Sequence, residues 1–211
     1  MDAIEQLHRE IIACRHCELA GFIPRALPVV WGHTGNRIML IGQAPGITEQ
    51  TQRRPFAGRS GRELFRWLAS IGNAEDEFRA HVYMTAITKC FPGKAATGSG
   101  DRRPSGREIA LCRPWLERQL ALVRPEVILL VGGLAVETYF PKQPLTQLIG
   151  RRFAVEGRIV IPLPHPSGAS RWLNAPEHRA LLEQALTHVG DVWSCRGPDR
   201  LLAPPPSDMV G

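Results

Sequence analysis

The sequence predicts an α/β fold in which a mainly parallel central sheet lies between two layers of helices. Short apolar runs of strand length alternate along the chain with longer segments that repeat apolar residues at helical spacing. Serine is followed three residues later by glutamate at Ser60 and at Ser105, a capping-box pattern that precedes a helix. Because strands that alternate with helices pair in parallel and bury both faces, we expect a three-layer α/β/α architecture.

The first elements follow from the N-terminal third of the chain. Residues 4–14 repeat isoleucine and leucine at helical spacing, which predicts a helix. The apolar run 37–41 ends in the glycine- and proline-rich turn 42–46, which is typical of a short buried strand. The pattern at Ser60 then opens the next helix.

The same alternation continues to the C-terminal part of the chain. We expect, in order, a strand at 81–88, a helix at 105–122, a strand at 126–131, a helix at 133–140, a strand at 158–163 and a helix at 177–188. Ligands of parallel sheets bind at the carboxyl ends of the strands. The loops after Ile41, Thr88 and Leu163 are therefore expected to form one cleft.

Composition sets the class of protein and of partner. The 211 residues, 44% of them hydrophobic, suffice for one core, so we expect a single domain over 1–190 and a flexible tail over 191–211. The net charge of +6 comes mainly from arginine, which suits a phosphate-bearing partner. No leader pattern or bilayer-length apolar run is present, so we expect a cytoplasmic monomer without membrane contact.

Four cysteines are spaced as a metal site. Cys14 and Cys17 form C-x2-C, and Cys90 and Cys112 return far downstream. Four thiolates satisfy either zinc or an iron–sulfur cluster, and the spacing leaves both open. A disulfide suits a reducing interior less well, and the polar flanks of the first pair argue against cysteines buried only as small hydrophobic residues. Cys195, in the polar tail, is expected to be free.

Two loops are candidates for binding and catalysis. In residues 42–61 the glycines let a planar ligand approach the backbone, Phe56 offers a stacking face, and Ser60 and Gly61 open a helix that could bind phosphate. In the second loop, His165 stands between two prolines that restrict its backbone, as a catalytic residue requires. The alternatives are an ordinary strand-to-helix turn and a structural histidine.

These motifs resemble the uracil-DNA glycosylase superfamily, most closely its iron–sulfur branch, family four, over residues 1–190. The branch has a G-E-A-P-G loop and a P-F-x-G-x-[SA]-G segment, matched here by G-Q-A-P-G at 42–46 and P-F-A-G-R-S-G at 55–61. Its H-P-S motif is matched at 165–167. In that branch, four cysteines arranged like these hold a 4Fe-4S cluster.

The resemblance implies a uracil-DNA glycosylase-like fold and a monofunctional DNA repair glycosylase. Such an enzyme flips uracil out of single- or double-stranded DNA and hydrolyses its N-glycosidic bond, leaving an abasic site. The residues implied are His165, Gln43 and Glu49 for catalysis; Gly42, Ala44, Phe56, Ala86 and Ser167 for the substrate; Ser60, Gly61, Ser170 and Arg171 for DNA; and Cys14, Cys17, Cys90 and Cys112 for the 4Fe-4S cluster.

Each implied role has a chemical reason. His165 would donate a hydrogen bond to uracil O2 as negative charge develops there. Phe56 would stack on the base, and Glu49 is the carboxylate near the first loop that could orient water. Arg171 and Trp172 could fill the gap left by the extruded base. The basic insertion 91–103 would attract phosphates.

Three positions depart from the family. Gln43 replaces the usual glutamate, Ala44 stands where other family members have an aspartate, and Ala86 replaces the asparagine of T-N-V-V-K-C that reads the uracil edge. The alternative is therefore a noncatalytic or trapping iron–sulfur protein that binds uracil-containing or damaged DNA. A covalent trap is less favoured because the insertion 91–103 contains no histidine. A nucleotide site at Gly132-Gly133 is weaker still.

Overall fold

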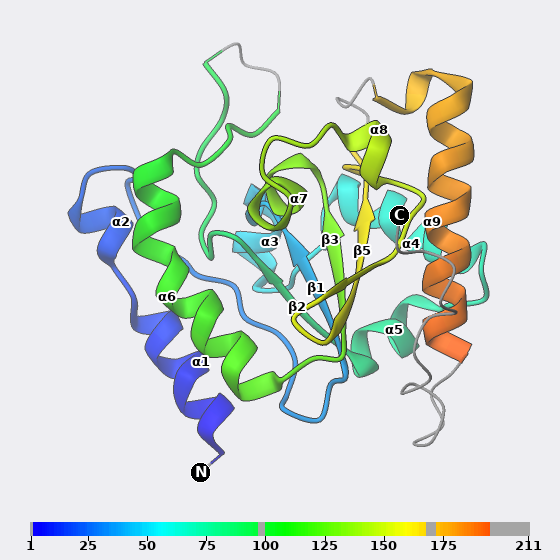
Figure 1. Ribbon diagram of the computed structural model, residues 1–211. Coiled ribbons are helices and arrows are strands. Elements are labelled where there is room, and N and C mark those ends of the chain that lie inside the picture. Colours follow the sequence, from blue (N-terminus) through cyan, green and yellow to red (C-terminus); the bar gives the residue numbers. More distant parts are fainter. Residues whose placement is uncertain (1, 97–99, 168–171, 195–211) are drawn as a thin grey trace.

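The computed structural model describes residues 2–96, 100–167 and 172–194 (Figure 1). Its helices are α1 (Ala3–Ala13), α2 (His16–Leu19), α3 (Ile47–Gln52), α4 (Arg59–Ala69), α5 (Glu75–His81), α6 (Gly106–Val123), α7 (Gly133–Tyr139), α8 (Leu145–Leu148), the 3-10 helix η1 (Trp172–Asn174) and α9 (Pro176–Ser194). Its strands are β1 (Ile38–Gly42), β2 (Val82–Ala86), β3 (Val127–Val131), β4 (Phe153–Val155) and β5 (Arg158–Leu163). In these ranges no helix is long and apolar enough to cross a bilayer.

The five strands form one sheet in the order β2-β1-β3-β5-β4. Strands β2, β1, β3 and β5 are parallel to one another. The edge strand β4 pairs antiparallel with β5. The predicted mainly parallel sheet is thereby confirmed. Its register sets Gly42 beside Ala86 and Val131 beside Leu163, so the carboxyl ends of the parallel strands share one edge of the sheet.

Two hydrophobic cores lie on opposite faces of the sheet. Along β1, Ile38 and Leu40 belong to one core, and Met39 and Ile41 belong to the other, as the alternation of a strand requires. The first core packs against α4 and α9, and the second packs against α1, α6 and α7. Figure 1 shows α1 and α6 side by side on one side of the sheet and α9 on the other. The predicted three layers are confirmed.

The capping patterns had two different outcomes. At α6 the box is present, since the Ser105 side chain accepts from the backbone of Glu108, whose carboxylate accepts in return from the Ser105 N–H. The box predicted at Ser60 is wrong, because α4 already begins at Arg59 and its N-cap is Gly58. Glu63 instead accepts from the Trp67 indole N–H at 2.8 Å. A distant carboxylate caps α4, as described below.

Several short elements were not predicted, among them α2, α3, α5, α8 and β4. The strand expected at 81–88 is shorter, because His81 ends α5 and the strand stops at Ala86. The next two residues continue beside β1 without strand geometry: the N–H of Ile87 donates to Gly42 O at 2.9 Å, and that of Thr88 donates to Gln43 O at 3.2 Å. This segment leads from the sheet edge to Cys90.

Candidate functional site

One open cleft of about 730 Å³ lies at the carboxyl edge of the parallel strands. Nine of the residues singled out from the sequence line it: Gly42, Gln43, Ala44, Glu49, Phe56, Ser60, Ala86, His165 and Ser167. Gly61 is buried outside this lining, and Ser170 and Arg171 lie outside the described residues. The three loops expected to meet, those after β1, β2 and β5, do so.

His165 is held as a neutral hydrogen-bond donor. The backbone N–H of Ser167 donates to its Nδ1 at 3.1 Å, so this nitrogen carries a lone pair and the ring proton resides on Nε2. Burial lowers the pKa of His165, and the nearby negative charge of Asp101 opposes that change. At neutral pH the ring is therefore uncharged and has one N–H to donate.

A glycine supports the His165 ring from behind. Gly132, the residue before α7, has a φ of +88°, and a Cβ added there would come within 2.8 Å of His165 Cδ2. The ring thus packs directly on backbone at the end of β3. This contact gives Gly132 a role in placing the histidine.

Phe56 lies on the floor of the cleft in a constrained backbone conformation. Its φ is +51°, in the left-handed region that side chains rarely adopt. Its ring lies against Gly42, where an added Cβ would be 3.0 Å from Phe56 Cζ. A Cβ at Gly61 would be 1.8 Å from the Phe56 carbonyl oxygen, so Gly61 is needed for helix α4 to approach this loop.

Arg79 holds the Phe56 loop from inside the protein. Its guanidinium donates to Pro55 O at 2.8 Å and to Phe56 O at 3.0 Å. It also pairs with Glu75 at 2.8 Å and lies 4.4 Å from the centre of the Phe65 ring. Burial lowers the pKa of Arg79, and its hydrogen bond to Glu75 opposes this. The sequence analysis missed Arg79, which looks like any arginine on a short helix.

Glu49 is the carboxylate that caps helix α4. Its Oε1 accepts from the N–H of Gly58 at 2.8 Å, which ties the first loop to the helix N-terminus. Its Oε2 lies beside Gly46, 2.7 Å from the position of an ideal Cβ on that glycine. Glu49 therefore lines the cleft with one oxygen already engaged in the fold.

A second carboxylate, which the sequence analysis missed, also lines this cleft. Asp101 Oδ2 lies 3.0 Å from the same ideal Cβ position at Gly46. Asp101 Oδ1 accepts from Lys94 Nζ at 2.7 Å, and the two residues also form a β-bridge. This pairing within the insertion brings Asp101 to the first loop.

The positions that were expected to contact a base carry few polar side chains. Ala86 offers only a methyl group at the end of β2, and its carbonyl accepts from Lys89 Nζ at 2.5 Å. Within the described ranges, Gln43 is the one side-chain amide that lines the cleft. Trp172 stacks on His178 with ring centres 4.2 Å apart and packs against the core. The described Trp172 side chain is thus committed to the fold.

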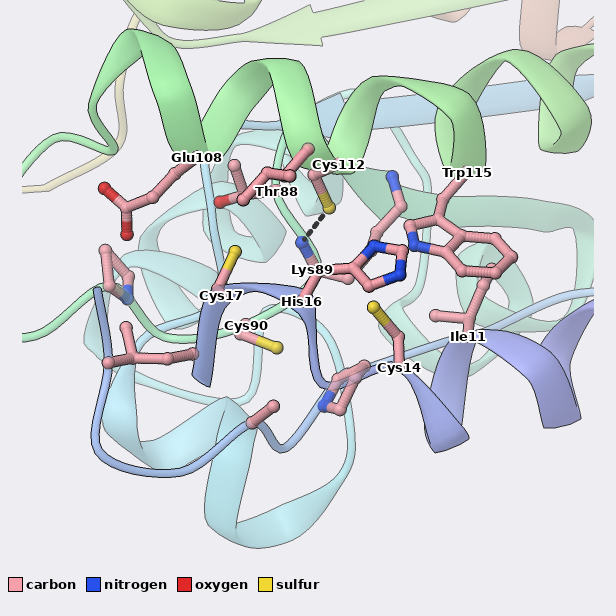
Figure 2. A pocket seen from close by; sticks show the side chains of 15 residues that line it. Ile11, Cys14, His16, Cys17, Thr88, Lys89, Cys90, Glu108, Cys112 and Trp115 are labelled. Carbon is pink, nitrogen blue, oxygen red and sulfur yellow. Dashed lines mark hydrogen bonds between the residues drawn. The ribbon is translucent and has the colours of Figure 1, made fainter. Parts of the chain in front are cut away.

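The four cysteines come from four segments and meet in one pocket. Cys14 is the C-cap of α1, Cys17 lies in α2, Cys90 follows β2, and Cys112 lies in α6. Figure 2 shows their sulfur atoms around a common space. All four are free thiols. The N–H of Lys89 donates to Cys112 Sγ at 3.2 Å.

Burial in this pocket disfavours the charged thiolate form of its cysteines. Burial raises the pKa of Cys17 to about 11 and that of Cys90 to about 12, and the charge of Cys112 adds to both changes. Burial also raises the pKa of Cys112. Burial lowers the pKa of Lys89 to about 8, and the nearby Cys112 and Cys90 oppose this. Thiolates here need positive charge of the kind that a metal group supplies.

One hydroxyl of this pocket lacks a partner. Thr88 Oγ1 is buried and makes no hydrogen bond to any described residue. A buried polar group without a partner is costly. An acceptor bound among the thiols would remove the cost of burying the Thr88 hydroxyl.

Glu108, which also lines this pocket, is paired with an arginine. Arg102 donates to both carboxylate oxygens of Glu108, at 2.7 and 2.8 Å, and to Phe22 O at 3.1 Å.

Fold and site together define an α/β protein with a histidine-bearing cleft at the carboxyl edge of its sheet and a four-thiol pocket that shares Pro92 with the lining of the cleft. Residues 30–187 match the uracil DNA glycosylase superfamily. The chain belongs to this family.

Curated relatives match nearly the whole chain. A type-4 uracil-DNA glycosylase of Sulfurisphaera tokodaii is 31% identical over 201 residues, which cover 91% of this chain and 86% of that protein. A type-4 uracil-DNA glycosylase of Archaeoglobus fulgidus is 30% identical over 207 residues, covering 94% and 97%. The crystal structure of wild-type Pedobacter heparinus SMUG2 aligns with 75% of this chain and 76% of its own, at 14% identity and a TM-score of 0.46.

Proposed function

We propose that this protein is a monofunctional uracil-DNA glycosylase that carries one 4Fe-4S cluster. The observation that carries the proposal is the neutral His165, whose Nε2–H is the ring's only donor and which shares one cleft with Phe56 and Gln43. A donor, a stacking ring and an amide are the groups needed to grip a flipped pyrimidine and to stabilise its departure. Similarity to type-4 enzymes over nearly the full chain supports the substrate.

The chemistry expected of these residues starts with binding. The flipped base stacks on Phe56, whose loop Arg79 holds in place. As the glycosidic bond breaks, negative charge develops on uracil O2, and His165 Nε2–H donates to it. A neutral imidazole makes this bond without leaving an uncompensated cation in the cleft before the reaction. The interaction strengthens only in the transition state, so it raises the rate of the chemical step.

Uracil is selected here without the asparagine usual in the family. The Gln43 side chain is the amide available at the base edge, while the Ala86 methyl and the Phe56 ring set the shape of the pocket. We therefore propose that Gln43 reads the polar edge of the base. Shape and stacking supply the remaining discrimination.

The DNA backbone is expected to follow the rim of the cleft. Arg59 and Ser60 open α4 and line the cleft, and Lys94 lines it from the insertion. Arg59 has no ion-pair partner among the described residues, so its guanidinium is free for a phosphate. The net charge of +6 adds long-range attraction that weakens with salt.

The thiol pocket fits an iron–sulfur cluster. Its donor set is four thiols, and no three Cys, His, Asp or Glu side chains of the described chain approach closely enough to hold a single ion. Separated thiols around a shared space suit a larger group, and the unpaired Thr88 hydroxyl would gain a sulfur acceptor. Cys14, Cys17, Cys90 and Cys112 would hold the cluster, which would cross-link four chain segments when bound.

A second candidate is a noncatalytic protein that binds uracil-containing DNA through the same cleft. The observation that favours it is the pair of methyl groups, Ala44 and Ala86, at positions where family members carry polar side chains. Incubation of the purified protein with uracil-containing single-stranded and duplex oligonucleotides, followed by alkaline cleavage, decides between the two. Free uracil and an abasic site support the enzyme, and tight binding without either product supports the noncatalytic protein.

A further inference from the structure

We infer that Asp101 is the general base that accepts a proton from the attacking water. The inference rests on the proposed glycosylase function and assigns the role that Ala44 leaves vacant. It also replaces Glu49, the carboxylate nearest to Ala44 in the sequence, as the candidate for this role.

The insertion holds Asp101 in a defined position at the cleft. Beside the Lys94–Asp101 β-bridge, the N–H of Ala95 donates to Gly100 O at 3.1 Å and that of Arg102 donates to Gly93 O at 2.9 Å. The Arg102 guanidinium then anchors the end of this hairpin to Glu108 on α6. The carboxylate is thus presented from a structured segment, as precise proton transfer requires.

Each of the two cleft carboxylates has one engaged oxygen and one oxygen, Glu49 Oε2 or Asp101 Oδ2, without a hydrogen-bond partner among the described residues, and the two differ in what the engaged oxygen does. Glu49 uses Oε1 to cap α4, so removing its charge would also disturb the helix. Asp101 uses Oδ1 to pair with Lys94, while Oδ2 has no hydrogen-bond partner among the residues that the structure describes. Its side chain is 34% exposed, so water reaches it. Asp101 therefore has an oxygen available for a water molecule.

The absence of a side chain at Gly46 lets the two carboxylates approach each other beside this glycine. Asp101 Oδ2 and Glu49 Oε2 lie 3.0 and 2.7 Å from the place that a Cβ on Gly46 would occupy, so both oxygens face the bare side of this glycine. A water molecule bound between these oxygens would find two acceptors, neither of them paired within the part of the chain that the structure describes. The charge of Asp101 also acts on His165, which places the base and the proposed donor within electrostatic reach of each other in one cleft.

The step balances without another reactant. The C1′–N1 bond breaks and its electron pair leaves with the base, whose O2 is stabilised by His165 Nε2–H. The water oxygen bonds to C1′ of the sugar cation, and one water proton passes to Asp101 Oδ2. The products are an abasic sugar with a 1′-hydroxyl and a uracil anion. The anion then regains a proton, which restores Asp101 as a carboxylate.

The test uses the full-length, cluster-loaded protein and single-turnover excision from a uracil-containing oligonucleotide. Asp101→Asn keeps the shape and removes the basic oxygen, so we expect a rate loss of roughly 10²-fold or more, the scale for general-base catalysis. DNA affinity should stay within about 3-fold of wild type. The matched control, Glu49→Gln, retains a side chain that can accept from Gly58, and we expect a smaller rate loss.

A second measurement separates a base from a structural residue. Adding formate to Asp101→Ala supplies a small carboxylate in the vacated space and should restore part of the rate, whereas formate should not affect Asp101→Asn. An Asp101→Asn rate near that of an active wild type would overturn the role of Asp101 and leave the proposed function standing. If wild type releases no uracil from any oligonucleotide, the proposed function fails and this role fails with it.

Discussion

The backbone N–H of Ser167 donates to Nδ1 of His165 at 3.1 Å, and this contact decides which ring nitrogen carries the proton. With Nδ1 occupied as an acceptor, Nε2 is the donor. The imidazole is thus oriented by a hydrogen bond within the H-P-S motif, which the serine makes through its backbone amide. Ser167 was expected to contact the substrate, and its described contact is with the catalytic candidate.

Excision should persist when the pH falls below the ordinary histidine pKa of 6.5. Burial lowers the pKa of His165, so the folded ring stays neutral as the pH falls through 6.5 and gains a proton only below that value. The unfolded chain binds this proton sooner, so His165 makes the native state less stable as the pH falls below 6.5. Single-turnover rates and thermal unfolding from pH 5 to 8 would show both trends. A rate that rises as His165 gains a proton would contradict the neutral donor.

Replacing His165 should slow the chemical step far more than it weakens binding. His165→Ala removes a donor that acts as charge develops, so single-turnover excision should fall by roughly 10²-fold or more. DNA affinity should change little. Ser167→Ala is the matched control, because it removes the hydroxyl but keeps the backbone N–H that orients the ring. A His165→Ala rate close to wild type would leave the histidine with a structural role only.

Loss of the stacking ring should be costly in a cleft with few polar groups. Phe56→Ala should weaken transition-state binding by about 1–3 kcal/mol, the range for one base–aromatic contact. Ala86→Asn adds the amide usual in the family, and it should either raise uracil excision or clash at the end of β2. Rates on uracil, hypoxanthine, xanthine and thymine substrates measure both variants. Equal excision by Phe56→Ala and wild type would show that Gln43 or another group provides the main grip.

The purified protein should be brown and contain iron and sulfide in equal amounts. Replacing any one of the four pocket cysteines by serine should lower iron content and destabilise the fold, because metal binding is coupled to folding. Cys195→Ser is the internal control. Cys195 lies outside the described residues and is expected from the sequence to be free, so the iron content of this variant should match wild type. Anaerobic analysis that finds stoichiometric zinc without sulfide would rule out the cluster.

Thr88→Val should affect the apo and loaded proteins in opposite ways. The substitution removes a buried hydroxyl that lacks a partner among the described residues, so it should stabilise the apo protein by about 1 kcal/mol. In the loaded protein the hydroxyl would have a cluster sulfur as its acceptor, so the same change should be neutral or destabilising. Chemical denaturation of both forms gives the difference. Equal stabilisation of both forms would mean that Thr88 does not contact the cluster.

The sequence predicted the parts of the fold that follow from local patterns. The strand at 158–163 and the capping box at Ser105 are as expected, because apolar runs and caps are local signals. The box at Ser60 failed because α4 has Gly58 as its N-cap, and the N–H of Gly58 donates to Glu49, nine residues before Gly58. Long-range partners of this kind leave no spacing signal.

In the candidate site, too, residues in local motifs were predicted, and residues placed by long-range contacts were not. Motifs identified nine residues that line the cleft, since a family resemblance marks loops. Arg79 and Asp101 were missed because their contacts depend on tertiary structure. Arg79 reaches the Phe56 loop from a short helix, and Asp101 reaches Gly46 through a hairpin closed by Lys94.

The segment that bonds to Gly42 and Gln43 through Ile87 and Thr88 also carries Cys90. The cleft and the thiol pocket therefore share one short stretch of chain, and a substitution there would affect both sites. We expect a mutational scan to find residues 86–90 unusually intolerant, with compensating second-site changes arising in the thiol pocket for alterations made in the cleft. Over evolutionary time, new base preferences would be more accessible through the loop after β1, because residues 43–46 do not line the thiol pocket.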